Sequence, residues 1–93
     1  MNTTQTLMIA TDATAIFKVP TGEKKPVTIA VHPGNGGTVT VETMTASGGE
    51  WVPVASGGLA GDLSAPVSDV LTGTLYAVEF SASGAPATIE LAW

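Results

Sequence analysis

The sequence contains no cysteine, which excludes disulfide bonds and zinc sites built on thiolates. It also contains no arginine, and three lysines stand against eight aspartates and glutamates, so the net charge is −5. Proteins that bind nucleic acids or anionic membranes use clustered Lys and Arg side chains. The composition therefore argues against both kinds of partner.

Long apolar runs and export signals are missing too. No run approaches the ~20 apolar residues that a membrane helix needs. Residues 1–5 have no basic region, and no long apolar stretch follows, so we expect no signal peptide. Charged residues make up 12% of the chain, against roughly 25% in typical soluble domains. We therefore expect a surface built from Thr, Ser, Gly and Ala, or one that is partly covered by another chain.

What is present is alternation of apolar and polar residues, and no window has the spacing of a capped amphipathic helix. The stretch 37–54 predicts the β-hairpin around which the chain is organised. Val39 and Val41 face one side, and Ser47-Gly48-Gly49 forms the turn. Trp51 opens the return strand, and Pro53 marks an edge or a strand end, because proline cannot donate to a ladder.

The other alternating runs predict further strands at 4–10, 15–19, 27–31, 74–80 and 87–93. In the run 74–80, Leu75 and Ala77 are expected on one face, and Tyr76, Val78 and Phe80 on the other. Turns are expected at 11–13, 20–26, 32–37, 72–73 and 81–86. The sequence thus predicts a single all-β domain over 1–93, an antiparallel β-sandwich or jelly roll of about seven to eight strands.

Two segments could have a further role. Residues 1–12, which include the strand expected at 4–10, could form an N-terminal arm or strand. Residues 55–68 are a long loop, which could hold a short strand, a helical turn or an arm that docks on a neighbour.

Residues that carry chemistry do not form a recognisable constellation. His32 is the only histidine and precedes Pro33-Gly34, where an exposed turn residue is expected rather than a general base. Asp12, Asp62 and Asp69 lie in or beside loops without the Asp-x-Asp-x-Asp spacing of a calcium loop, so turn or capping roles are expected. We expect no enzyme activity, no catalytic residue, no cofactor and no metal.

The aromatic residues allow two interpretations. Trp51, Tyr76 and Trp93 could form a sugar-stacking platform, as aromatics do in β-sandwich carbohydrate-binding modules, or they could supply the large side chains of the core. Core packing is the favoured interpretation for Trp51. Trp93 could close the core or anchor a subunit contact.

Three stretches carry a resemblance to a known group of proteins: Ala15-Ile16-Phe17-Lys18-Val19-Pro20, Trp51-Val52-Pro53-Val54 and Leu75-Tyr76-Ala77-Val78. Across residues 12–93, the pattern resembles small virion proteins of tailed bacteriophages, of the capsid decoration (cement) or head and tail accessory type. The resemblance implies a structural protein that self-associates, for example as a trimer, and stabilises the head by binding the major capsid protein. It would be located on the virion and assembled in the host bacterial cytoplasm.

Partner contacts are expected from the N-terminal strand, the long loop and the C-terminal end, since termini and long loops often order on a partner. The candidate contact residues are Leu7, Ile9, Leu59, Leu63, Val67 and Trp93. The alternative function is a carbohydrate- or receptor-binding sandwich module of a phage tail or fibre. That alternative predicts that Trp51 or Tyr76 is exposed.

Overall fold

The computed structural model describes residues 3–19, 26–45, 49–53, 55–56, 59–71 and 75–93, and these residues contain no helix. Their strands are β1 (Thr4–Ile9), β2 (Thr14–Lys18), β3 (Val27–Pro33), β4 (Thr38–Thr45), β5 (Val52–Pro53), β6 (Ala55–Ser56), β7 (Leu59–Ala60), β8 (Asp62–Leu63), β9 (Val67–Leu71), β10 (Leu75–Ser83) and β11 (Ala87–Ala92). The all-β prediction is confirmed.

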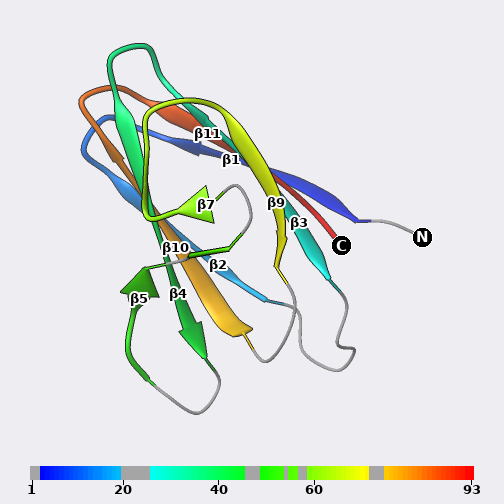
Figure 1. The fold of residues 1–93 in the computed structure, drawn as a ribbon. Helices are drawn as coiled ribbons and strands as arrows, with labels where there is room; N and C mark the ends of the chain where they lie inside the picture. Colours follow the sequence, from blue (N-terminus) through cyan, green and yellow to red (C-terminus); the bar gives the residue numbers. More distant parts are fainter. Residues whose placement is uncertain (1–2, 20–25, 46–48, 54, 57–58, 72–74) are drawn as a thin grey trace.

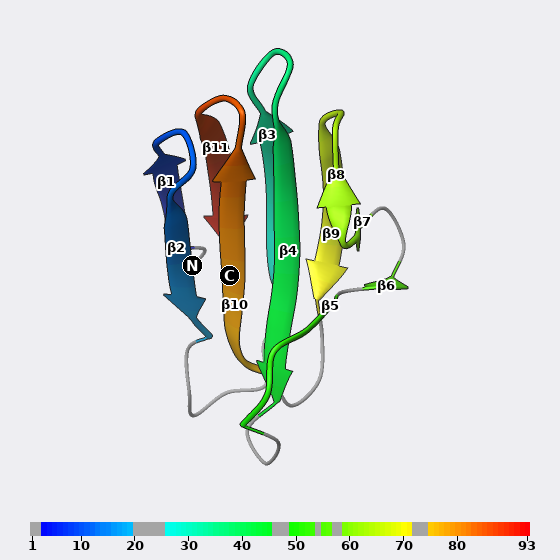
Figure 2. The same ribbon diagram turned by 90° about the vertical axis from the view of Figure 1, so that its left-hand side faces the viewer.

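The strands form two antiparallel sheets that lie face to face (Figures 1 and 2). One sheet has the order β1-β11-β3-β9. The other has the order β2-β10-β4-β5, with β8 also paired to β4, and β6 pairs with β7 on its own. The chain changes sheet at every step from β1 to β4 and again from β9 to β11. This alternation is a jelly roll, so the strand order decides between the two architectures that the sequence left open.

The core lies between the two sheets and is made of alternate residues of the long strands. The fully buried side chains include Ile29, Val31, Val39, Val41, Val78, Phe80 and Ile89. They occupy every second position because successive side chains of a strand point to opposite faces. In the strands over 4–10, 15–19, 27–31 and 87–93, the alternate apolar residues face the core, as their alternation with the other residues predicts.

The predicted faces of β10 are wrong at its first two residues. Leu75 pairs with Thr45, but Ala77 pairs with Met44, so Tyr76 is an additional residue that has no counterpart on β4. Such a bulge shifts the alternation by one position. Leu75 therefore packs against the core together with Val78, while Tyr76 is exposed.

The segment predicted as a long loop is also different. Residues 55–68 contain the three two-residue strands β6, β7 and β8 and the start of β9, so the short strand that the sequence left open is confirmed. Leu59 and Leu63 insert their side chains into the core. A two-residue strand has no alternation to detect, which is why the sequence pattern could not locate these elements within the segment.

Two predicted turns are shorter than expected, because β3 continues to Pro33 and β10 continues to Ser83. The hairpin over 37–54 is confirmed by the pairing of β4 with β5, which lies at the end of its sheet as Pro53 predicted, but the return strand begins at Val52 rather than Trp51. The predicted turns over 47–48, 20–25 and 72–73 lie outside the described residues.

The β3–β4 turn packs tightly against the β10–β11 turn, and this contact requires a glycine. A Cβ on Gly37 would come within 2.8 Å of Ala85 Cβ and 2.9 Å of the Ser83 carbonyl oxygen. We expect Gly37→Ala to lower the free energy of unfolding by about 1–3 kcal/mol, the usual cost of overpacking. Urea titration measures this loss, and Thr38→Ala on the adjacent exposed residue is the control. Equal losses for the two variants would contradict the tight contact.

Candidate functional site

The face of the β1-β11-β3-β9 sheet that points away from the core is a broad surface, and it is called the outer face below. The strand registers place its side chains in three rows across the sheet. The rows are Thr4–Ala92–Thr28–Val70, Thr6–Glu90–Ala30–Ser68 and Met8–Thr88–His32. Threonine and alanine dominate, and Met8 is 86% exposed.

Among the described residues of the outer face, the ionisable side chains are His32 and Glu90, which lie side by side. His32 Nε2 lies 3.5 Å from Glu90 Oε1, and the two side chains are 44% and 61% exposed. A contact at this exposure contributes little to stability, because water competes for both side chains. His32 is exposed as predicted, but it lies in strand β3 rather than in a turn. The other residues in the three rows of the outer face are uncharged.

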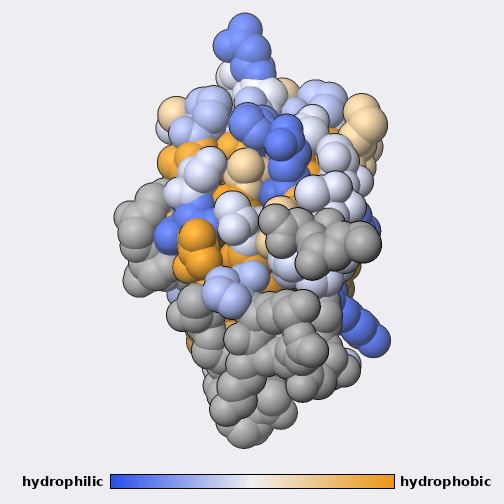
Figure 3. Space-filling model, turned by 90° about the vertical axis from the view of Figure 1, so that its right-hand side faces the viewer, coloured by the Kyte–Doolittle hydropathy of each residue, from blue (hydrophilic) through white to orange (hydrophobic). Residues whose placement is uncertain are grey.

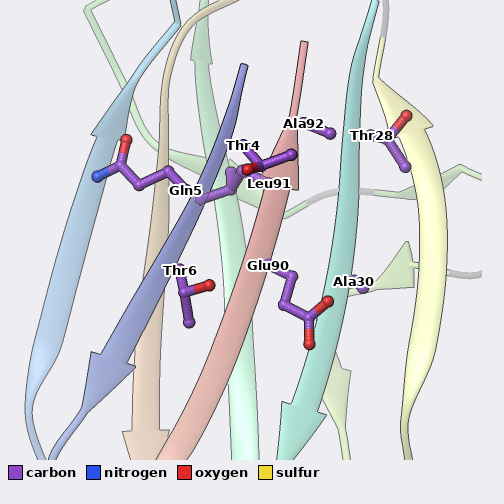
Figure 4. A pocket seen from close by; sticks show the side chains of 8 residues that line it. All are labelled: Thr4, Gln5, Thr6, Thr28, Ala30, Glu90, Leu91 and Ala92. Carbon is purple, nitrogen blue, oxygen red and sulfur yellow. The ribbon is translucent and has the colours of Figure 1, made fainter. Parts of the chain in front are cut away.

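A hollow of about 380 Å³ lies on the outer face beside this pair (Figure 4). Its lining residues are Thr4, Gln5, Thr6, Thr28, Ala30, Glu90, Leu91 and Ala92. The short side chains of Ala30 and Ala92 leave space next to the longer Glu90. Threonine hydroxyls and the Glu90 carboxylate supply hydrogen-bonding groups, so the hollow can receive small polar groups of a bound molecule.

The surface around the hollow is weakly polar (Figure 3), with small hydrophobic and hydrophilic areas side by side. The outward face of the opposite sheet differs, because Glu42 lies directly across from Glu79 and Asp62 lies beside Thr40. Lys18 is on that side too, with its Nζ 6.0 Å from the centroid of the Tyr76 ring. Most of the charge on the two sheets therefore lies away from the outer face.

The structure gives core roles to the six residues that the sequence singled out as partner contacts. Ile9, Leu59 and Leu63 are buried, while Leu7, Val67 and Trp93 are partly buried and pack against the core. Packing in or against the core explains why these residues are apolar, so their apolar character does not indicate an exposed interaction surface. Contact between these residues and a partner stays a prediction.

The three aromatics do not gather in one place among the described residues. Trp93 packs on Phe17 with ring centroids 5.1 Å apart, so it closes the core, one of its two predicted roles. Trp51 is partly buried in the segment before β5, while Tyr76 is 42% exposed. The exposure of Tyr76 meets the condition set by the sugar-binding alternative, which stays a prediction.

Of the three aspartates, only Asp12 takes the turn role that the sequence predicted, because Asp62 and Asp69 lie in strands β8 and β9. Asp12, at φ 58° in the β1–β2 turn, accepts a hydrogen bond from the Gly84 N–H at 3.3 Å. Asp62 accepts one from the Thr40 hydroxyl, and Asp69 accepts one from the Val70 N–H.

In the described part of the chain, no three His, Asp or Glu side chains gather as a metal site. The same residues include no helix that could cross a membrane.

Comparison with known proteins adds support for the fold. No protein-family model matches the sequence, and no curated protein matches it. The crystal structure of Yersinia pseudotuberculosis-derived mitogen is similar, with a TM-score of 0.50 and 14% identity. The match covers 99% of this chain and 83% of the mitogen chain. At this identity the likeness concerns the fold alone, and it agrees with an all-β chain of two antiparallel sheets.

Proposed function

We propose that the protein is a non-enzymatic structural subunit that self-associates and docks on the outside of a phage head as a decoration protein. The observation that carries the proposal is the outer face, a surface made mainly of threonine and alanine whose ionisable side chains are His32 and Glu90. Interfaces of assembled proteins are depleted of charge at their centres. The resemblance to small phage virion proteins points the same way.

The fold is compatible with this role but is not evidence for it. Jelly rolls occur both in viral capsid domains and in lectin domains, so the function has to be argued from the surface residues. The outer face has no exposed aromatic ring among its described residues on which a sugar could stack. Its small side chains suit close approach of another protein surface, with the hollow beside Glu90 receiving polar side chains of the shell.

The proposal can be tested by co-sedimentation of the purified protein with phage heads that lack their decoration protein. Thr28→Glu places a charge on the outer face beside the hollow, and we expect it to weaken binding by about tenfold, since a buried unpaired charge costs more than 1.4 kcal/mol. Thr38→Glu is the matched control, because Thr38 is an exposed strand threonine on the opposite sheet.

The control variant is expected to bind heads like the unmodified protein. If the unmodified protein does not sediment with heads, the decoration role is excluded. If Thr28→Glu and Thr38→Glu weaken binding equally, the outer face is not the docking surface.

A further inference from the structure

The edges of the two sheets are not protected equally. An exposed edge strand presents unpaired main-chain groups that can pair with another chain, and proteins block such edges with charges, prolines or very short strands. Edge strand β2 carries Lys18, β5 has two residues and ends in Pro53, and β8 has two residues including Asp62. At the edge strand β9, Asp69 accepts a hydrogen bond from the Val70 N–H.

Edge strand β1 has none of these devices. Its residues Thr4–Ile9 include no charge and no proline, and the strand lies along the margin of its sheet (Figure 2). Among the described edge strands that are longer than two residues, β1 is the one that has neither a charged residue nor a proline.

The direction of the free main-chain groups of β1 follows from its pairing with β11. Thr3 and Trp93 exchange two hydrogen bonds, from Thr3 N to Trp93 O at 2.7 Å and from Trp93 N to Thr3 O at 2.9 Å. In an antiparallel pair, such hydrogen-bonded positions alternate with positions that point away from the partner. The N–H and C=O groups of Thr4, Thr6 and Met8 therefore face the open edge.

We propose that β1 pairs antiparallel with β1 of a second copy of this chain, about a two-fold axis through Thr6. Residues that are directly opposite in a pair point to the same side of a sheet, so the outer faces of both copies continue only if outward residues oppose one another. With Thr6 opposite Thr6, Thr4 lies opposite Met8. Every main-chain group that these three residues present to the edge then has a partner.

The side chains fit this register. Threonine opposite threonine is a favourable cross-strand pair, because the hydroxyl of one can bond the other. The Met8 side chain contacts Thr4 of the second copy, which covers part of the most exposed large apolar side chain among the described residues. On the inner side, the partly buried Leu7 lies opposite Gln5.

The pairing of β1 with β1 specifies the contact through which two copies would associate, as proposed above. This pairing does not depend on binding to phage heads. It also joins two outer faces into one continuous surface twice as wide. If the dimer forms and does not bind heads, the pairing stands and the decoration role fails.

A single introduced cysteine tests the register, because the chain has none of its own. Opposed hydrogen-bonded residues have Cα atoms about 5.5 Å apart, which is within the range that a disulfide spans. We expect Thr6→Cys to form a covalent dimer under mild oxidation at least about tenfold faster than Ile16→Cys. Ile16 is the matched control, because the bonds from Val19 N to Tyr76 O and from Ala82 N to Ala13 O leave its main-chain groups on the free edge of β2.

Light scattering of Thr6→Lys provides the second test. Two lysines facing each other on the axis should raise the dimer dissociation constant by about tenfold or more, while Ile16→Lys leaves it unchanged. Equal rates of cross-linking for the two cysteine variants would overturn the proposal. A mass of 9.3 kDa for the unmodified chain at every concentration, or a dimer that Thr6→Lys does not weaken, would do so as well.

Discussion

Leu59→Ala is expected to lower the free energy of unfolding by about 2–5 kcal/mol, the usual cost of truncating a buried leucine. The side chain of Leu59 is 1% exposed and belongs to the core, although its strand β7 has only two residues. The loss contains the transfer of the deleted atoms to water and the cavity that remains. Thermal or urea unfolding followed by circular dichroism measures it.

The matched control is Ile16→Ala, which truncates an exposed aliphatic side chain on β2 and should cost less than about 1 kcal/mol. This comparison also separates two roles for residues 55–68. If the segment were an arm reserved for a partner, Leu59→Ala would leave the stability of the protein unchanged and weaken only its association.

Phe80→Ala is expected to cost about 3–5 kcal/mol, a large part of the roughly 5–15 kcal/mol by which proteins of this kind are stable. Phe80 is fully buried in β10, the strand between β2 and β4. Its register partners Ala15 and Val41 also face the core, so the ring of Phe80 is enclosed by other core residues. Urea titration measures the shift in the unfolding midpoint.

Tyr76→Ala is the control for Phe80→Ala, because it removes another aromatic ring from the same strand. The bulge at Tyr76 turns this side chain outward, so we expect a loss of about 1 kcal/mol or less. Similar losses for the two variants would mean that Tyr76 and Phe80 share a face, as uninterrupted alternation predicts.

The sequence predicts most of the fold because most of its long strands alternate without interruption. Val27, Ile29 and Val31 of β3 are an example, since all three are buried as their spacing predicts. The bulge at Tyr76 could not be predicted, because its extra residue has no distinctive chemistry. The positions of the strands β6, β7 and β8 could not be predicted, because two residues cannot show a period.

The candidate site was harder to predict than the fold. The sequence pointed to apolar residues such as Leu59 and Leu63 as partner contacts, and the structure places both in the core. The outer face is made of threonines and alanines that become neighbours only through the registers of β1, β11, β3 and β9. Such registers join residues that are far apart in the chain, and periodicity within one strand does not contain them.

The open edge of β1 is the central feature of this account, and amide hydrogen exchange of the unmodified protein tests it most directly. In a dimer, the N–H groups of Thr4, Thr6 and Met8 gain hydrogen bonds, while those of Gln5 and Leu7 are already bonded to β11. We expect exchange at Thr4, Thr6 and Met8 to slow as protein concentration rises, whereas Gln5 and Leu7 stay protected throughout. Fast exchange at Thr6 at every concentration, equal to that at Ile16, would contradict it.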